Sequence, residues 1–393
     1  MNFFESTKTL DLASRLRFGR LCTGPIEPGV WAILEPAGVQ NHAPQLCWIN
    51  PDQLACVWMA GGQEGTSGMQ VVLSVLKRGN SLWSSPVVVS QDLERSEQNP
   101  LLFLVERSGK SWLQLIHTAQ QVRQPGEEIA EGSTFSKQWT ASLRIQERSP
   151  KGRWRKAHDL IDGAAFCRNP PHRCADGSLL LPIYRSLETG GAFGHDHSQV
   201  LLLDPDGRPT GTVVDVPDST GRVHGSIVLS GDGQSLLQFF RSRLADRIYR
   251  SIGSLDGLHW TSPQATVLPN NNSSIQACRL ASGRLAMIFN RFSIGSEPAD
   301  SSDWGEAIWP RTRWPLSVAL SEDDGDSWPW IRDLDTGFGF SGTRNWMLNG
   351  QLVHPTLLEG VPDELHLAYS WAGSQPIRYL CIQEEEIIGL ESY

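Results

Sequence analysis

The sequence lacks any uninterrupted run of 18 apolar residues, so it predicts no transmembrane helix. It is also short of positive charge. Its 34 Lys and Arg residues stand against 43 Asp and Glu residues, and the net charge of −9 argues against a nucleic-acid partner. Residues 1–20 lack the basic start, apolar core and small-residue cleavage site of a secretory signal. We therefore expect a cytoplasmic protein with neither a membrane nor a nucleic-acid partner.

Closely spaced cysteines are missing as well. The seven cysteines include no C-x-x-C pair and their number is odd, which is typical of a reduced chain with free thiols. His195 and His197 would face the same side of an extended segment, but no third ligand lies near them in the sequence. We therefore predict no metal and no cofactor.

The most informative stretch is a turn with the pattern S-x-D-x-G-x-x-W, which is formed by Ser321, Asp323, Gly325 and Trp328. The Asp323 carboxylate can accept hydrogen bonds from backbone N–H groups one or two residues on, Gly325 supplies a positive φ, and Trp328 can fold back over the turn. A second copy, one residue shorter, is formed by Ser254, Asp256, Gly257 and Trp260. Each copy follows an apolar run, so both are interpreted as structural turns between two strands of a repeated unit.

A longer pattern recurs six times along the chain. A polar residue, often followed by Pro, opens an apolar strand; a Gly, Asn or Asp turn and a second apolar strand follow. The copies open at His42, Asn99, Arg168, His224, Asn271 or Asn272, and His354. A third and a fourth strand follow the first five copies. Six units of four antiparallel strands predict an all-β, six-bladed β-propeller that occupies residues 1–393 as one domain.

The last unit has a third strand, Ile377 to Ile382, but no fourth strand after it. A strand from residues 1–40, either Val30 to Glu35 or Leu16 to Cys22, is therefore expected to close the ring. Residues 383–393 are acidic and predict a short helix or tail. The rival fold, a two-sheet sandwich, does not need six evenly patterned units.

Strand direction predicts where the polar side chains gather. Because the strands of a blade alternate in direction, the openings of the first strands and the ends of the second strands share one face, opposite the two turns. We therefore predict a pocket on the propeller axis that draws its side chains from both sets. Besides the opening residues, the candidates are Glu64, Arg241, Arg291 and Trp371, with Arg313 and Trp309 from the long loop between residues 292 and 313.

From about residue 40 to residue 382 the chain resembles the sialidase (neuraminidase) superfamily, in particular the bacterial type with BNR (Asp-box) repeats. Members of that superfamily clamp the substrate carboxylate with three arginines, use a Tyr paired with a Glu as nucleophile, and use an Asp as acid/base. Residue by residue, the resemblance places the second and third clamp arginines at Arg241 and Arg313. It implies an acidic carbohydrate or glycoconjugate as the partner, cleaved from a chain end.

Four positions depart from the family pattern. His42 stands in place of the first clamp arginine, His224 in place of the Glu, and His354 in place of the Tyr, while Glu64 is the sole carboxylate at the acid/base position. Tyr369 lies on the strand next to His354. We expect Glu64 to protonate the leaving oxygen while Tyr369 or His354 attacks the sugar or activates water.

Two alternatives stay open. In a uronate lyase, Arg241 and Arg313 would stabilise enolate-like charge while His224 or His354 removes the α-proton. In a non-catalytic propeller, the same pocket would bind a glycan or a partner protein without changing it.

Overall fold

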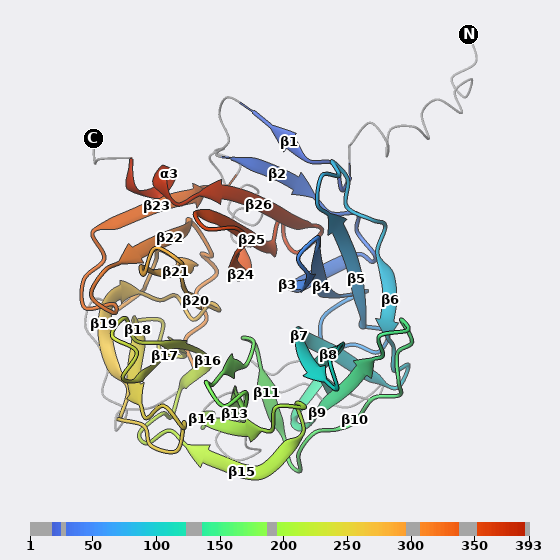
Figure 1. Ribbon diagram of the computed structural model, residues 1–393, viewed down its shortest axis with the longest axis horizontal. Helices are drawn as coiled ribbons and strands as arrows, with labels where there is room; N and C mark the ends of the chain where they lie inside the picture. Colours follow the sequence, from blue (N-terminus) through green and yellow to red (C-terminus); the bar gives the residue numbers. More distant parts are fainter. Residues whose placement is uncertain are drawn as a thin grey trace.

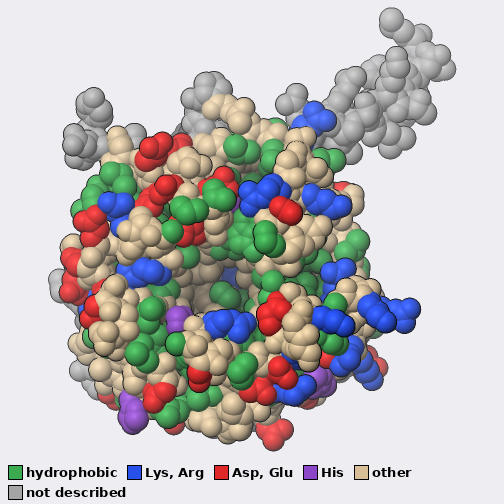
Figure 2. All heavy atoms as spheres, in the orientation of Figure 1, with side chains coloured by type: hydrophobic (Ala, Val, Ile, Leu, Met, Phe, Trp, Pro, Cys, Tyr) green, Lys and Arg blue, Asp and Glu red, His purple; other side chains and the backbone are tan. Residues whose placement is uncertain are grey.

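The computed structural model describes residues 18–24, 29–122, 136–186, 195–295, 307–337 and 352–389. Six antiparallel sheets surround a central axis (Figure 1), so the predicted all-β, six-bladed propeller is confirmed and the two-sheet sandwich is excluded. Seen from one side, the surface is hollowed at the centre of the ring (Figure 2). In the described part of the chain, no helix combines the length and the hydrophobicity that crossing a membrane takes.

Consecutive strands build the first five blades from the axis outward. The first blade contains β3 (Gln40–Asn50), β4 (Gln53–Gly61), β5 (Gln70–Lys77) and β6 (Val87–Ser90). The second contains β7 (Arg95–Arg107), β8 (Lys110–Val122), β9 (Ser136–Arg148) and β10 (His158–Asp159). The third contains β11 (Ala165–Cys167), β12 (His172–Arg173), β13 (Leu179–Arg185), β14 (His197–Leu203) and β15 (Pro209–Asp215). The next two contain β16 (Arg222–Leu229), β17 (Leu236–Ser242), β18 (Arg247–Gly253) and β19 (Gln264–Pro269); and β20 (Gln276–Arg279), β21 (Leu285–Asn290), β22 (Leu316–Ser321) and β23 (Trp330–Asp335).

The sixth blade joins the two ends of the chain. It comprises β24 (Val353–Glu359), β25 (Glu364–Ser370) and β26 (Ile377–Gln383), followed outward by β2 (Val30–Ile33) and β1 (Cys22–Thr23). β2 runs antiparallel to β26, with Val30 opposite Cys381 and Ile33 opposite Arg378. An N-terminal strand therefore occupies the fourth position of this blade, and β1 adds a fifth strand. The short helix α3 (Glu385–Ile388) follows β26 (Figure 1).

The hydrophobic core lies between neighbouring blades, because side chains alternate between the two faces of each strand. On β25, Leu365 and Leu367 pack against Leu316 and Val318 of the fifth blade. Ala368, the residue after Leu367, packs on the other side, with Trp58 of the first blade. Each blade is thus covered on both faces, which fixes the inner strands rigidly around the axis.

The two Asp turns lie where the sequence predicts, between β18 and β19 and between β22 and β23. Gly325 has a φ of +89°, and the Trp328 indole N–H donates to its carbonyl at 3.2 Å. The Asp323 carboxylate differs from the expectation in reaching farther along the chain, since it accepts the backbone N–H of Ser327, four residues on, at 2.8 Å. One residue separates Asp323 from Gly325, whereas Asp256 and Gly257 are adjacent in the other copy. The Asp323 carboxylate therefore closes a wider turn.

The shorter copy follows the predicted geometry. The Asp256 carboxylate accepts the backbone N–H of Leu258, two residues on, at 3.0 Å, and the Trp260 indole donates to the Gly257 carbonyl at 2.9 Å. In the other turn, Asp324 accepts the N–H of Gly231, which lies between β16 and β17. The Asp turns therefore share a face with the turns between first and second strands, opposite the end where the inner strands open.

Candidate functional site

A pocket of about 530 Å³ opens on the axis at the end where the inner strands begin. The structure brings eight of the predicted site residues together in its wall: His42, Glu64, Asn99, His224, Arg241, Trp309, Arg313 and His354. The other residues that line it are Gln98, Gln138, Phe166, Tyr184, Arg243, Pro310, Arg311 and Val353.

Bulges in the inner strands place these side chains. Asn99, His224 and His354 have left-handed backbones, with φ between +49° and +55°, and Ala43 beside His42 has a φ of +52°. The pairing register of β3, β7, β16 and β24 shifts at these positions. A left-handed conformation at a residue other than glycine is costly and persists only where surrounding contacts enforce it. The bulges turn the opening residues toward the axis.

Arg168 and Asn169 supply contacts that hold these bulges. They occupy the gap between β11 and β12, where the inner strand of the third blade is interrupted. Arg168 is 1% exposed, and its Nη2 donates to the carbonyls of Pro44 at 2.8 Å and His354 at 2.7 Å. The Asn169 amide donates to the carbonyl of His224 at 2.9 Å. Arg168 was predicted to bind substrate, but it does not line the pocket: its Nη2 is bonded to the backbone beneath it, while Nε and Nη1 are buried without a hydrogen-bond partner among the described residues.

Three guanidinium groups surround the indole of Trp309. The Cζ atoms of Arg241, Arg243 and Arg313 lie 5.2, 5.1 and 6.0 Å from the ring centroid. Arg243 forms a buried ion pair with Asp196, with 2.6 Å between Nη2 and Oδ2. The cluster therefore concentrates positive charge on one wall of the pocket.

Neither of the other two arginines has a carboxylate within 4 Å in the part of the chain that the structure describes. Instead, Arg241 Nε donates to the Asn272 side-chain carbonyl at 2.7 Å, and Arg313 Nη1 donates to the Asn272 backbone carbonyl at 2.6 Å. Burial, followed by repulsion from Arg243 and Arg313, lowers the pKa of Arg241 well below its usual range. Burial and Arg243 lower the pKa of Arg313 to about 10. An anion bound here would relieve this repulsion, and guanidinium groups match the planar, bidentate geometry of a carboxylate.

Three imidazoles form another part of the wall. The ring centroids of His42 and His354 are 4.3 Å apart, and those of His224 and His354 are 6.2 Å apart. Ser374 and Ser274 hydrogen-bond to Nδ1 of His42 and His224, at 3.0 and 2.7 Å. Burial lowers the pKa of His42 to about 3 and holds those of His224 and His354 well below their usual range. All three rings are therefore neutral at pH 7.

Glu64 is placed by the loop that follows β4. Its Oε2 lies 3.9 Å from Nε2 of His42, and its backbone N–H donates to the side chain of Gln40. Its side chain is 43% exposed. Desolvation by the surrounding protein raises the pKa of this carboxyl group, and this effect outweighs the opposite effect of the Arg241 charge. The raised pKa favours the protonated form that a general acid requires.

The model of the BNR repeat-like domain family matches residues 52–371. The chain belongs to this family. Its fold is also that of solved sialidases. The sequence matches no curated protein.

Three solved structures illustrate the likeness. The Hadza microbial sialidase has a TM-score of 0.64 at 12% identity, over 89% of this chain and 67% of that one. The Trypanosoma rangeli sialidase has a TM-score of 0.60 at 9% identity, over 91% and 56% of the two chains. A protein of unknown function from Dyadobacter fermentans has a TM-score of 0.68 at 13% identity, over 90% and 97%. At these identities the likeness shows the fold alone.

Within this BNR-repeat propeller, two predicted residues lie away from the pocket. Tyr369 is fully buried and its hydroxyl donates to Asp335 at 2.8 Å. Trp371 packs in the same cluster and lies against Arg378, whose Cζ is 5.6 Å from the indole ring. Both predictions are corrected because Tyr369 on β25 and Trp371 just after it pack in the cluster that joins Leu365 to the fifth blade.

Asn271 and Arg291 also stand outside the pocket wall. The Asn271 amide donates to the Thr312 carbonyl at 2.8 Å, so this residue supports the loop that carries Arg313. Arg291 pairs with Asp333 on β23. These two predictions are therefore corrected, and Asn272 is the asparagine that contacts the arginine cluster.

Sequence reasoning missed Arg243 and its partner Asp196. A signal was present, because Arg243 follows Arg241 by two residues and side chains at that spacing face the same side of an extended chain. Asp196 lies between His195 and His197, but only the two histidines were considered. Its contact with Arg243 spans 47 residues and could not be read from local sequence.

Proposed function

We propose that this BNR-repeat propeller is a glycoside hydrolase that removes a carboxylated sugar from a chain end in its axial pocket. The arginine cluster around Trp309 carries the proposal, since Arg241, Arg243 and Arg313 face one pocket and only Arg243 forms an ion pair among the described residues. A sugar carboxylate is an anion whose size and planarity suit two guanidinium groups.

The shape of the pocket supports cleavage at a chain end. Its volume of about 530 Å³ lies in the range of small-molecule sites. Arg168 and Asn169 cross the axis beneath it and bind inner-strand carbonyls, so a polysaccharide cannot thread through. The terminal sugar therefore enters and the remainder of the chain points outward.

The proposed chemistry uses Glu64 as general acid and His354 as general base. Glu64 donates its proton to the leaving oxygen as the bond to the anomeric carbon breaks, and His354 takes a proton from the water that attacks this carbon. Among the described residues, Nδ1 of His354 is buried without a hydrogen-bond partner, so the base that faces the pocket would be the other ring nitrogen, Nε2. A bound carboxylate would offset the arginine charges that help to lower the pKa of His354, and this would strengthen the base. Tyr369 takes no part.

The first experiment compares fluorogenic glycosides of N-acetylneuraminic, glucuronic and galacturonic acids with the corresponding neutral glucoside and galactoside. We expect hydrolysis of an acidic glycoside and none of the neutral ones. Glu64→Gln should abolish turnover of that substrate, whereas the exposed control Glu94→Gln should retain it. Equal hydrolysis of neutral glycosides, or full activity of Glu64→Gln, would contradict the proposal.

The neutral imidazoles favour one second candidate, a uronate lyase. His224 or His354 would remove the proton beside the sugar carboxylate, while Arg241 and Arg313 stabilise the enolate-like charge. This reaction produces an unsaturated uronate that absorbs in the ultraviolet. A rise in that absorbance on an acidic polysaccharide would select the lyase, and binding of acidic sugars with no product would select a non-catalytic role.

A further inference from the structure

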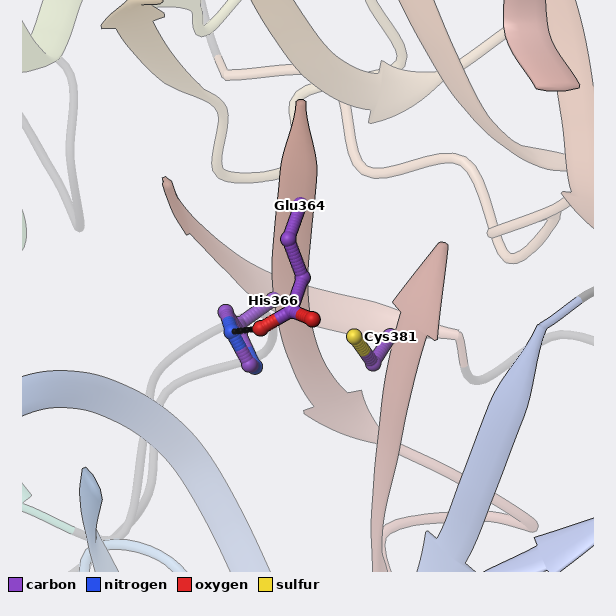
Figure 3. Close-up of side chains that lie close together, drawn as sticks. All are labelled: Glu364, His366 and Cys381. Carbon is purple, nitrogen blue, oxygen red and sulfur yellow. Dashed lines mark hydrogen bonds and ion pairs between the residues drawn. The ribbon is translucent and has the colours of Figure 1, made fainter. Parts of the chain in front are cut away.

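A second cluster of chemically reactive side chains lies in the sixth blade, outside the axial pocket (Figure 3). Glu364 and His366 are two residues apart on β25, so they share one face of the strand. Cys381 is directly opposite His366 on the antiparallel strand β26. One carboxylate oxygen, one imidazole nitrogen and the thiol sulfur all lie within 4.8 Å of one another. The pairing register of β25 and β26 thus brings Cys381 beside Glu364 and His366.

These three donors are those of a zinc site. Zn²⁺ binds thiolate sulfur, imidazole nitrogen and carboxylate oxygen, and sites with three protein ligands keep a fourth position for water. We propose that Glu364, His366 and Cys381 bind one divalent cation of the zinc type. This proposal departs from the expectation from the sequence, which considered only His195 and His197 and predicted no metal.

The imidazole is already oriented for such a role. The Tyr379 hydroxyl lies 2.7 Å from Nδ1 of His366, and the edge of the ring meets Trp48 with the centroids 5.2 Å apart. These contacts aim Nε2 at Glu364, whose Oε1 lies 2.8 Å away. A second contact that fixes the ring is typical of metal-binding histidines. Glu364 is 31% exposed, which leaves a path from solvent for the ion.

Gly360 packs closely against the same two side chains. A Cβ at this position would lie 2.5 Å from Nε2 of His366 and 3.1 Å from Oε1 of Glu364. Its φ is not positive, so the backbone conformation itself does not require glycine here. Glycine is required because a larger residue would clash with His366 and displace the two atoms that would bind the cation.

The position of the cluster assigns the cation a structural role. Cys381 is paired across the sheet with Val30 of β2, the N-terminal strand that completes the last blade. Trp48, which contacts His366, belongs to the first blade. A cation held here would link β25 to β26 at the seam where the ring closes, and its binding energy would add to the stability of the folded state.

Cobalt titration of the metal-stripped full-length protein tests the proposal. Co²⁺ bound to a thiolate gives a near-ultraviolet charge-transfer band, and we expect this band to saturate at one ion per chain and to disappear when Zn²⁺ is added. Cys381→Ser should abolish the band, and His366→Gln should weaken the affinity for Co²⁺ by at least tenfold. Cys174→Ser, which changes another partly buried cysteine outside the cluster, should leave both unchanged.

Thermal unfolding supplies a second readout that does not involve the axial pocket. Zn²⁺ should raise the unfolding temperature of the wild type and of Cys174→Ser, but not that of Cys381→Ser. If Glu364 and His366 form only an ion pair, the wild type will show no thiolate band and no Zn²⁺-dependent shift, which overturns the proposal. Equal loss of the band in both cysteine variants would overturn it as well. If His366→Gln fails to fold, the pair of serine variants still decides the outcome.

Discussion

Replacing Arg241 by Met should weaken binding of the acidic sugar while changing the stability of the protein little. The Cζ atoms of Arg241 and Arg243 lie 5.2 and 5.1 Å from the same ring centroid, so their separation cannot exceed the sum of these distances, about 10 Å. At an effective dielectric constant of about 20, two unit charges at that distance repel each other by about 1.7 kcal/mol. Arg313, at 6.0 Å from the centroid, adds a similar repulsion. The substitution therefore removes about 3 kcal/mol of repulsion.

The same substitution removes favourable contacts. The hydrogen bond from Arg241 to Asn272 contributes about 1.5–3 kcal/mol because its donor is charged, and the contact with Trp309 contributes about 1 kcal/mol. Gains and losses nearly cancel, so we expect a free energy of unfolding within about 2 kcal/mol of the wild type. Arg243→Met is the matched comparison. It removes a comparable repulsion but leaves the buried Asp196 without its ion-pair partner, which costs about 3–5 kcal/mol, so we expect it to be less stable than Arg241→Met.

Urea unfolding at pH 7 measures the stability of both variants, and calorimetric titration with an acidic sugar measures their affinity. We expect each variant to lose roughly 100-fold in affinity, because a charge-assisted contact with the carboxylate is removed. The reasoning would be refuted if Arg241→Met were as unstable as Arg243→Met, or if it bound the sugar as tightly as the wild type.

Three further predictions concern pH, the Asp turn and the support beneath the pocket. Since burial lowers the pKa of His42 from 6.5 to about 3, the unfolded chain takes up a proton that the folded chain does not, and stability falls as the pH drops from about 6.5 toward 3. His42→Gln should reduce this slope in urea melts by about 1.4 kcal/mol per pH unit, and an unchanged slope would contradict the burial of a neutral ring. Asp323→Ala should lower the free energy of unfolding by about 1–2 kcal/mol in the same assay, because it removes the hydrogen bonds to Ser327. It should leave the affinity for the sugar unchanged, and an altered affinity would argue against a purely structural turn. Arg168→Lys should reduce turnover while sugar affinity stays within about tenfold, because it weakens the backbone support of His354; undiminished turnover would exclude that positioning role.

The fold was largely predictable because its signals are local. Each turn motif, such as Asp323 with Gly325, specifies its own geometry, and the opening residues recur in register, so His42, His224 and His354 could be placed around one axis. The left-handed bulges could not be predicted, since a positive φ is uncommon at every residue other than glycine. Contacts from Arg168, far away in the sequence, enforce them.

The site was predictable only in part, for two different reasons. Tyr369 was misplaced although strand alternation already assigned it to the same face as Leu365 and Leu367, which pack between blades. By contrast, the pairing of Arg243 with Asp196 depends on strand register and blade order. Such long-range contacts follow from the assembled ring and carry no local pattern.

A crystal soaked with the carboxylated sugar that binds most tightly tests the arginine pocket most directly. We predict that the sugar carboxylate lies within hydrogen-bond distance of at least two of Arg241, Arg243 and Arg313, with Glu64 facing the glycosidic oxygen. A carboxylate directed out toward solvent, or a sugar bound elsewhere on the propeller, would contradict the assignment of this pocket to an acidic sugar.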